Sequence, residues 1–90
     1  MTMFLIGYDL KRKEDYGSLH EAIMSLSTDW WHGLDSTWII KHKGSSESIL
    51  KALEPHLEEG DKLLVVPLFG AGSWFGMGEQ ERKSWLVANL

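Results

Sequence analysis

Asp9 is the residue of this sequence with the clearest capacity for chemistry. It ends an apolar segment, residues 3–8, and is followed closely by Lys11, Arg12 and Lys13. A carboxylate at the tip of a buried strand and beside cations stays ionised, as a ligand of a hard metal ion such as Mg²⁺ must. Aspartate also starts ordinary turns, by accepting a hydrogen bond from the amide two residues along the chain. The local sequence is compatible with both roles.

Two segments carry clustered positive charge and are candidates for contact with phosphate. They are Lys11 to Lys13, just after Asp9, and Lys41 to Lys43. The whole chain has 9 Lys and Arg against 13 Asp and Glu, a net charge of -4, which argues against a surface that is basic throughout. Contact with RNA or DNA is therefore expected to be local. Both segments are also typical of solvated loops whose cations offset neighbouring carboxylates.

Other combinations of residues are weaker candidates. His32 and Asp35 are close enough in sequence to ligate a metal together, but a histidine beside two tryptophans usually packs and forms hydrogen bonds. Ser36 would complete a Ser-His-Asp set with them, yet nothing around it resembles the turn that presents a nucleophile. The glycine-rich segment 70–78 lacks the lysine of a phosphate-binding loop.

Trp74 and Phe75 stand within this glycine-rich segment. Their rings could stack on bases or pack against protein, and leaving both in water would expose a large apolar surface. We therefore predict an ordered loop in which both rings are largely buried, against a partner chain or against the helix that bears Trp85.

Length and composition indicate one small domain. A chain of 90 residues buries only about 60–65% of its unfolded surface, so its core is thin unless a partner contributes to it. The absence of cysteine fits a reducing compartment, and we predict a cytoplasmic location. The apolar N-terminal segment is too short to span a membrane and ends at Asp9, so no membrane association is expected.

Hydrophobic periodicity divides the chain into alternating strands and helices. The stretch 30–42 is too long for one strand and is interrupted at 33–35, which favours two short strands. Pro55 lacks an amide hydrogen and is expected to break a helix near Glu54. The predicted elements are a strand over 3–9, a helix from Asp15 or Ser18 to about Ser27, two strands within 30–42, a helix capped by Ser45 or Ser46, a strand over 61–68, the loop 70–78 and a C-terminal helix over 79–90.

This order, β-α-β-β-α-β with an added helix, predicts an α+β domain of the ferredoxin-like type, with both central helices on one face of an antiparallel sheet. The strands, however, carry apolar residues at consecutive positions, including Trp30 and Trp31. Neighbours along a strand point to opposite faces, so the second face of the sheet must also be covered. A twofold homodimer packed sheet against sheet would cover it.

Three segments carry a resemblance to a known family. Residues 4–10, with the sequence FLIGYDL, residues 36–38, and the strand 61–68 together resemble the small CRISPR-associated Cas-two proteins. The similarity is greatest to their stand-alone, SinR-like relatives, and the VapD toxins are more distant. The resemblance covers residues 3–68 and rests on the ordered set of motifs.

The resemblance implies a ferredoxin-like homodimer that packs through its sheets. In this family some members are metal-dependent nucleases, some are non-catalytic scaffolds, and the VapD relatives are ribonucleases. The family's functional aspartate falls on Asp9, and a dimer implies that two such carboxylates hold a magnesium ion between them. Lys11, Arg12 and Lys13 would then contact the phosphates of RNA or DNA. The glycine-rich loop and the C-terminal helix depart from the family, whose members carry a further strand there.

Overall fold

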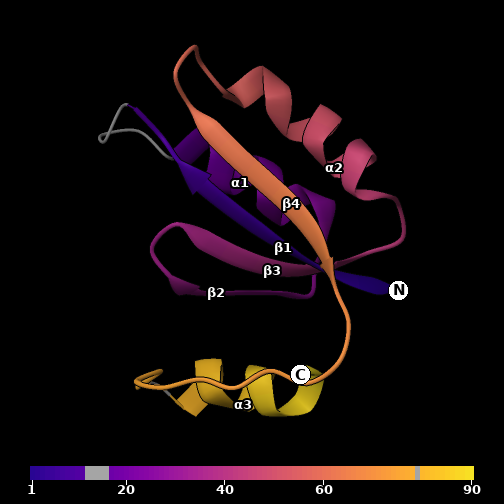
Figure 1. Ribbon diagram of the computed structural model, residues 1–90, viewed down its shortest axis with the longest axis vertical. Coiled ribbons are helices and arrows are strands. Elements are labelled where there is room, and N and C mark those ends of the chain that lie inside the picture. Colours follow the sequence, from indigo (N-terminus) through magenta and orange to yellow (C-terminus); the bar gives the residue numbers. More distant parts are fainter. Residues whose placement is uncertain (12–16, 79) are drawn as a thin grey trace.

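The structure, a computed structural model, describes residues 1–11, 17–78 and 80–90. Its elements follow the predicted order of strands and helices (Figure 1). Within the described residues they are β1 (Thr2–Asp9), α1 (Gly17–Leu26), β2 (Trp30–Leu34), β3 (Thr37–His42), α2 (Ser46–Leu53), a 3-10 helix η1 (Glu54–His56), β4 (Lys62–Leu68) and α3 (Gln80–Asn89). The α+β class and the C-terminal helix are thereby confirmed.

The strands form one antiparallel sheet in the order β2-β3-β1-β4, which places β1 in its interior. Side chains of β1 alternate between the two faces. Phe4, Ile6 and Tyr8 are buried on the face that meets α1 and α2, so Leu5 and Asp9 lie on the opposite face. Strand β4 forms an edge, where proline is tolerated because its missing amide hydrogen interrupts no ladder.

The main core lies between the sheet and the helix layer of α1 and α2. Each of these helices buries a pair of residues one turn apart, Leu19 with Ile23 and Ile49 with Leu53. This spacing places both members of a pair on one helix face, and each fully buried side chain contributes about 1.5–3 kcal/mol. Their buried partners from the sheet and its edge are Phe4, Ile6, Tyr8, Leu10, Trp38 and Ile40.

The boundaries of α2 follow the predicted signals. Ser45 caps its N-terminus in a reciprocal pair with Ser48, and the helix ends at Leu53 because Pro55 turns the chain into the 3-10 helix.

The start of α1 differs from the predicted start at Ser18, because the helix already includes Gly17. Ser18 therefore lies inside α1, and its hydroxyl pairs with Nδ1 of His56. Asp15, the other predicted start, lies outside the described residues.

The stretch 30–42 is a hairpin of two strands, as predicted, with its break at the turn after Leu34. Gly33 is required there by packing. The Trp31 indole lies over its backbone, and a Cβ at Gly33 would stand 2.2 Å from Cζ2 of that ring. Any other residue would displace the indole from its buried position.

The tryptophans of β2 point to opposite faces, as predicted. The Trp30 ring packs against Trp38, with ring centroids 5.0 Å apart, on the helix side of the sheet. Trp31 is buried on the second face, in a cluster with Ile39 and with Leu86 of α3. Helix α3 of the same chain thus covers the second face near β2, where the sequence alone predicts a partner's sheet (Figure 1).

The segment that precedes α3 meets the prediction only in part. Trp74 is half-buried and packs against the cluster of Trp31, Ile39 and Leu86. Phe75 is 95% exposed in the single chain, so it does not pack against the helix that bears Trp85, and its burial against a partner chain stays a prediction. Phe75 lies at a bend of the chain, next to Gly76 with a φ of +72°, whereas Trp74 meets the sheet.

No helix in the described part of the chain is both long enough and apolar enough to cross a membrane.

Candidate functional site at the end of strand β1

Asp9 is the last residue of β1 and is exposed on the sheet face opposite α1 and α2. In the ladder it stands opposite Lys62 of β4. Its carboxylate has no hydrogen-bond or ion-pair partner among the residues that the structure describes. A hard oxygen ligand of this kind is free to bind a cation or a partner.

A different aspartate organises the adjoining loop. The amide of Lys11 donates to Oδ1 of Asp61 at 2.8 Å, and the amide of Glu58 donates to Oδ2 at 2.8 Å. The turn-forming interpretation of Asp9 assigns the Lys11 amide to the Asp9 carboxylate. Because Asp61 already accepts from this amide, the loop does not need Asp9 as an acceptor.

The cations near Asp9 are only partly those that the sequence singles out. Lys11 is exposed, and its side chain crosses Gly60, where φ is +93° and a Cβ would stand 2.8 Å from Lys11 Cδ. Arg12 and Lys13 lie outside the described residues. Lys62 is an additional cation, exposed and on the same face as Asp9, because residues directly opposite in a ladder share a face. Only the register between β1 and β4 reveals it.

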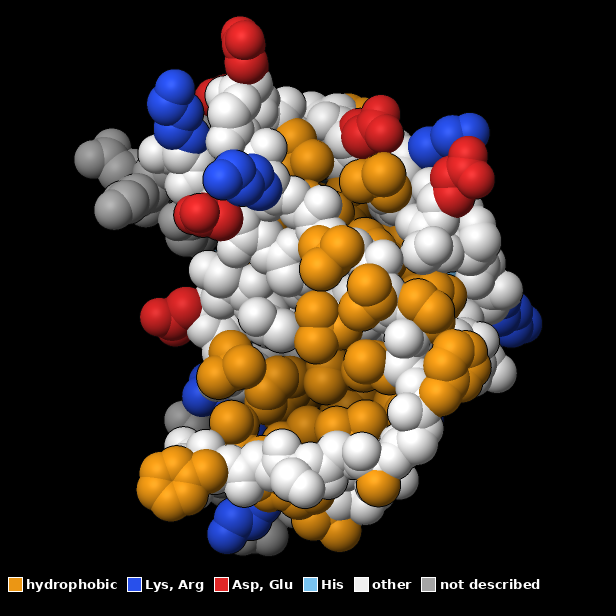
Figure 2. All heavy atoms as spheres, in the orientation of Figure 1, with side chains coloured by type: hydrophobic (Ala, Val, Ile, Leu, Met, Phe, Trp, Pro, Cys, Tyr) orange, Lys and Arg blue, Asp and Glu red, His pale blue; other side chains and the backbone are white. Residues whose placement is uncertain are grey.

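Next to Asp9 the same sheet face carries an apolar surface, which we call the open strip. It consists of Leu5 and Gly7 of β1 with their partners Val66 and Leu64 of β4. Leu64 is 60% exposed. Figure 2 shows apolar side chains gathered over this face of the sheet. A contiguous apolar surface on a soluble protein is a candidate contact site.

Gly7, in the middle of the open strip, is not required by the fold of the single chain. A Cβ at this position would lie 3.6 Å from Leu5 Cδ2, an ordinary contact, and the residue is not among those with positive φ. Glycine in the interior of a strand weakens the strand, and it often marks a place where another backbone or a ligand approaches closely.

The weaker candidates do not assemble into a site. His32 Nε2 lies 3.2 Å from the backbone oxygen of Asp35, and the His32 ring stacks on Trp38 with centroids 4.0 Å apart. The Ser36 carbonyl accepts the amide of Tyr8 at 3.1 Å. The described residues contain no group of three or more His, Cys, Asp or Glu side chains placed to hold a metal ion.

A polar and aromatic cluster that sequence reasoning missed joins α1 to the sheet. Tyr8 Oη lies 2.8 Å from His20 Nε2 and accepts the Trp38 indole N–H at 3.1 Å. The His20 and His32 rings meet edge to face, with centroids 5.0 Å apart. A signal did exist, because Tyr8 shares the buried face of β1 with Phe4 and a buried phenol needs a hydrogen-bond partner.

This cluster predicts that stability depends on pH. Desolvation, and secondarily the nearby His32, lower the pKa of His20 below its ordinary value of 6.5. As the pH falls through 6.5, His20 is protonated in the unfolded chain before it is protonated in the folded one. The free energy of unfolding is therefore highest above pH 6.5 and decreases as the pH falls toward the lower pKa of His20 in the folded chain. Urea unfolding at pH 7.5 and 5.5 should show a smaller loss in His20→Gln than in the wild type. Equal losses in the two proteins would contradict the assignment.

Comparison of the chain with protein-family models, with curated proteins and with solved structures finds no match.

Proposed function

We propose that this chain forms a twofold homodimer of ferredoxin-like subunits through the open strip, and that the dimer is a magnesium-dependent phosphodiesterase acting on RNA or DNA. One observation carries the proposal. The Asp9 carboxylate is exposed and unpartnered among the described residues, and it lies at the end of an uncovered apolar surface. Sheet-to-sheet contact along that surface would bring two Asp9 side chains toward the twofold axis.

The residues near the axis suit a hard cation. Two Asp9 carboxylates from separate chains would supply the oxygen ligands that magnesium prefers. Without the ion their like charges would repel each other, and the bound cation would offset this repulsion. The two Asp9 carboxylates would hold the ion, which would supply polarisation of the scissile phosphate and a lowered pKa of a bound water molecule. Lys62, opposite Asp9 in the ladder, and Lys11, two residues after Asp9, would contact the flanking phosphates, and Arg12 and Lys13 follow Lys11 in sequence.

A non-catalytic dimeric scaffold for nucleic acid or protein is the second candidate. It is favoured by the presence of one candidate carboxylate per chain, without a three-ligand cluster among the described residues. A nuclease also needs a group that activates water, and among the residues that the structure describes no general base stands out beside Asp9. A VapD-like ribonuclease toxin would share the site of the main proposal and differ from it in substrate.

The proposal is tested by mass and by cleavage. The chain should sediment as a dimer of two 10.3 kDa subunits at micromolar concentration, burying more than about 1,000 Å² in all. Incubation with single-stranded and duplex RNA and DNA, with and without Mg²⁺, should reveal cleavage of at least one class only when the metal is present. A dimer that cleaves none of them would support the scaffold, and a monomer would refute both.

Replacing Gly7 by alanine should separate folding from dimerisation. The change should raise the unfolding free energy of the dilute monomer by about 0.4–1 kcal/mol, because the substituted unfolded chain is less flexible. The added methyl group should hold the sheets apart and raise the dimer dissociation constant at least about tenfold. Urea unfolding and sedimentation equilibrium measure the two effects. Unchanged dimerisation would show that Gly7 is outside the interface, and tighter dimerisation would show that the two sheets do not approach closely at Gly7.

A further inference from the structure

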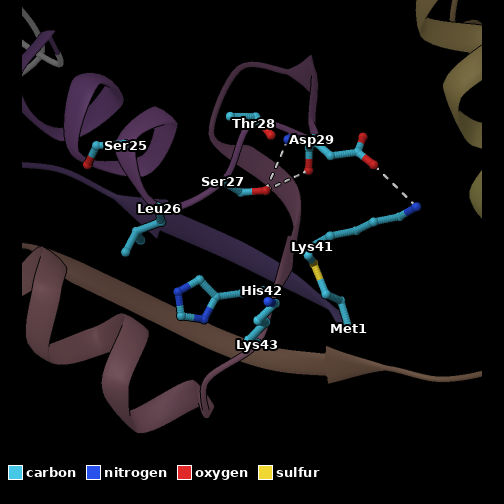
Figure 3. Close-up of a pocket in the computed structure, with 9 residues that line it drawn as sticks. All are labelled: Met1, Ser25, Leu26, Ser27, Thr28, Asp29, Lys41, His42 and Lys43. Atoms are coloured by element: carbon cyan, nitrogen blue, oxygen red, sulfur yellow. Dashed lines mark hydrogen bonds and ion pairs between the residues drawn. The ribbon is translucent and has the colours of Figure 1, made fainter.

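A cavity of about 750 Å³ opens at the opposite end of the sheet from Asp9. It lies between the turn after α1 and the end of β3 (Figure 3). His42 pairs with Thr2 at the start of β1, and β1 ends at Asp9, so the two places are about 23 Å apart at ~3.3 Å per residue. The residues that line the cavity are Met1, Ser25, Leu26, Ser27, Thr28, Asp29, Lys41, His42 and Lys43.

Two acceptors of this lining, the Asp29 carboxylate and the Ser27 hydroxyl, are already engaged. Asp29 Oδ1 accepts the Trp85 indole N–H at 2.8 Å, and Oδ2 lies 3.2 Å from Lys41 Nζ. Figure 3 shows the Lys41 side chain directed at this carboxylate. The Ser27 hydroxyl donates to the Asp29 carbonyl and accepts the Asp29 amide, both at 3.1 Å. The one carboxylate of the lining therefore already has a cation beside it, Lys41.

The groups that remain free are donors. Neither the Lys43 ammonium nor the Thr28 hydroxyl has a partner among the described residues. His42 Nδ1 accepts the Gly44 amide at 3.0 Å, so a neutral His42 ring carries its proton on Nε2 and presents a donor there. Figure 3 shows this ring extending toward Leu26, which adds an apolar wall. A cation and two neutral donors thus stand around one partly apolar space.

We infer that this cavity binds a small phosphate monoester. The Lys43 ammonium can form a charge-assisted bond to a phosphate oxygen, the strong kind, and His42 Nε2 and the Thr28 hydroxyl are further donors of the same lining. The volume is in the range of small-ligand sites, and Leu26 can contact the organic part. The net charge of -4 disfavours a long polyanion at a second place on the surface. This inference does not depend on Asp9 or on dimerisation.

The test uses the whole chain labelled with ¹⁵N and titrated at low salt with 5′-adenosine monophosphate, inorganic phosphate and adenosine. The monophosphate should give saturable amide shifts centred on residues 26–28 and 41–44. Inorganic phosphate should shift the same amides with weaker affinity, and adenosine should not saturate them. Absence of saturation by the monophosphate, or equal binding of adenosine, would overturn the inference.

Substitution of Lys43 by glutamine isolates its charge. Loss of one charge-assisted contact should weaken binding of the monophosphate by about tenfold. Lys83→Gln, which removes an exposed charge from α3, is the matched control and should change the affinity less than about twofold. Because both positions are exposed, both variants should fold, which their amide spectra would verify. Equal affinity in the two variants would contradict the assignment of the cavity.

Discussion

Replacing Asp9 by asparagine should abolish magnesium-dependent cleavage of nucleic acid while leaving the dimer intact. The substitution keeps the shape of the side chain and removes the charge that holds the metal. Loss of the electrostatic stabilisation supplied at the reacting phosphate should lower the rate by at least about 100-fold. The measurement is the initial rate of cleavage of the preferred substrate at saturating Mg²⁺, together with the sedimentation coefficient of each protein.

Asp35→Asn is the matched control, because Asp35 is also exposed and lies in the turn between β2 and β3. This variant should retain the activity of the wild type. Equal activity of Asp9→Asn and wild type would refute the catalytic role of Asp9, and an Asp9→Asn protein that no longer dimerises would assign the residue to assembly instead.

Replacing Leu64 by glutamate should convert the dimer into a folded monomer. In the single chain Leu64 is 60% exposed, so a carboxylate at this position remains in water and costs the fold little. In the proposed interface the same carboxylate would be buried without a partner, at a cost of several kcal/mol. The dimer dissociation constant should therefore rise by more than about 100-fold, as measured by sedimentation equilibrium.

Val87→Glu provides the comparison, since Val87 of α3 is 66% exposed and lies outside the open strip. It should dimerise as the wild type does. If Leu64→Glu and Val87→Glu have the same dissociation constant, the open strip is not the interface.

The fold could be predicted from the sequence because its signals are local. Leu19 with Ile23, and Ile49 with Leu53, repeat at the helical period, and Pro55 stops α2 by removing one amide hydrogen. Alternation also gives the correct faces of Trp30 and Trp31. These features depend on residues a few positions apart, and a single sequence displays them directly.

What covers the second face could not be predicted in the same way. The apolar residues on the second face of β2 and β3 indicate that this face is covered. They do not indicate whether α3 of the same chain or another chain covers it. In the structure Leu86 of α3 packs in one cluster with Trp31, whereas Leu64 is largely exposed. The exposure of Phe75 has a similar cause, because a glycine-rich segment leaves the direction of each side chain open.

The candidate site shows the same division between local and long-range information. Asp9 can be singled out from its place at the end of an apolar segment. That Asp61 takes the Lys11 amide, and that Lys62 stands opposite Asp9, depend on contacts between residues about fifty positions apart. Such contacts follow from strand register, which no local pattern in β1 specifies.

The central claim is that two Asp9 carboxylates share one metal ion at a twofold axis, and a calorimetric titration with Mn²⁺ tests it most directly. Manganese prefers the same oxygen ligands as magnesium and binds more readily to sites of this kind. We predict one ion bound for every two chains in the wild type and in Asp35→Asn, and none in Asp9→Asn. Binding of one ion to each chain, or binding that persists in Asp9→Asn, would contradict the shared site.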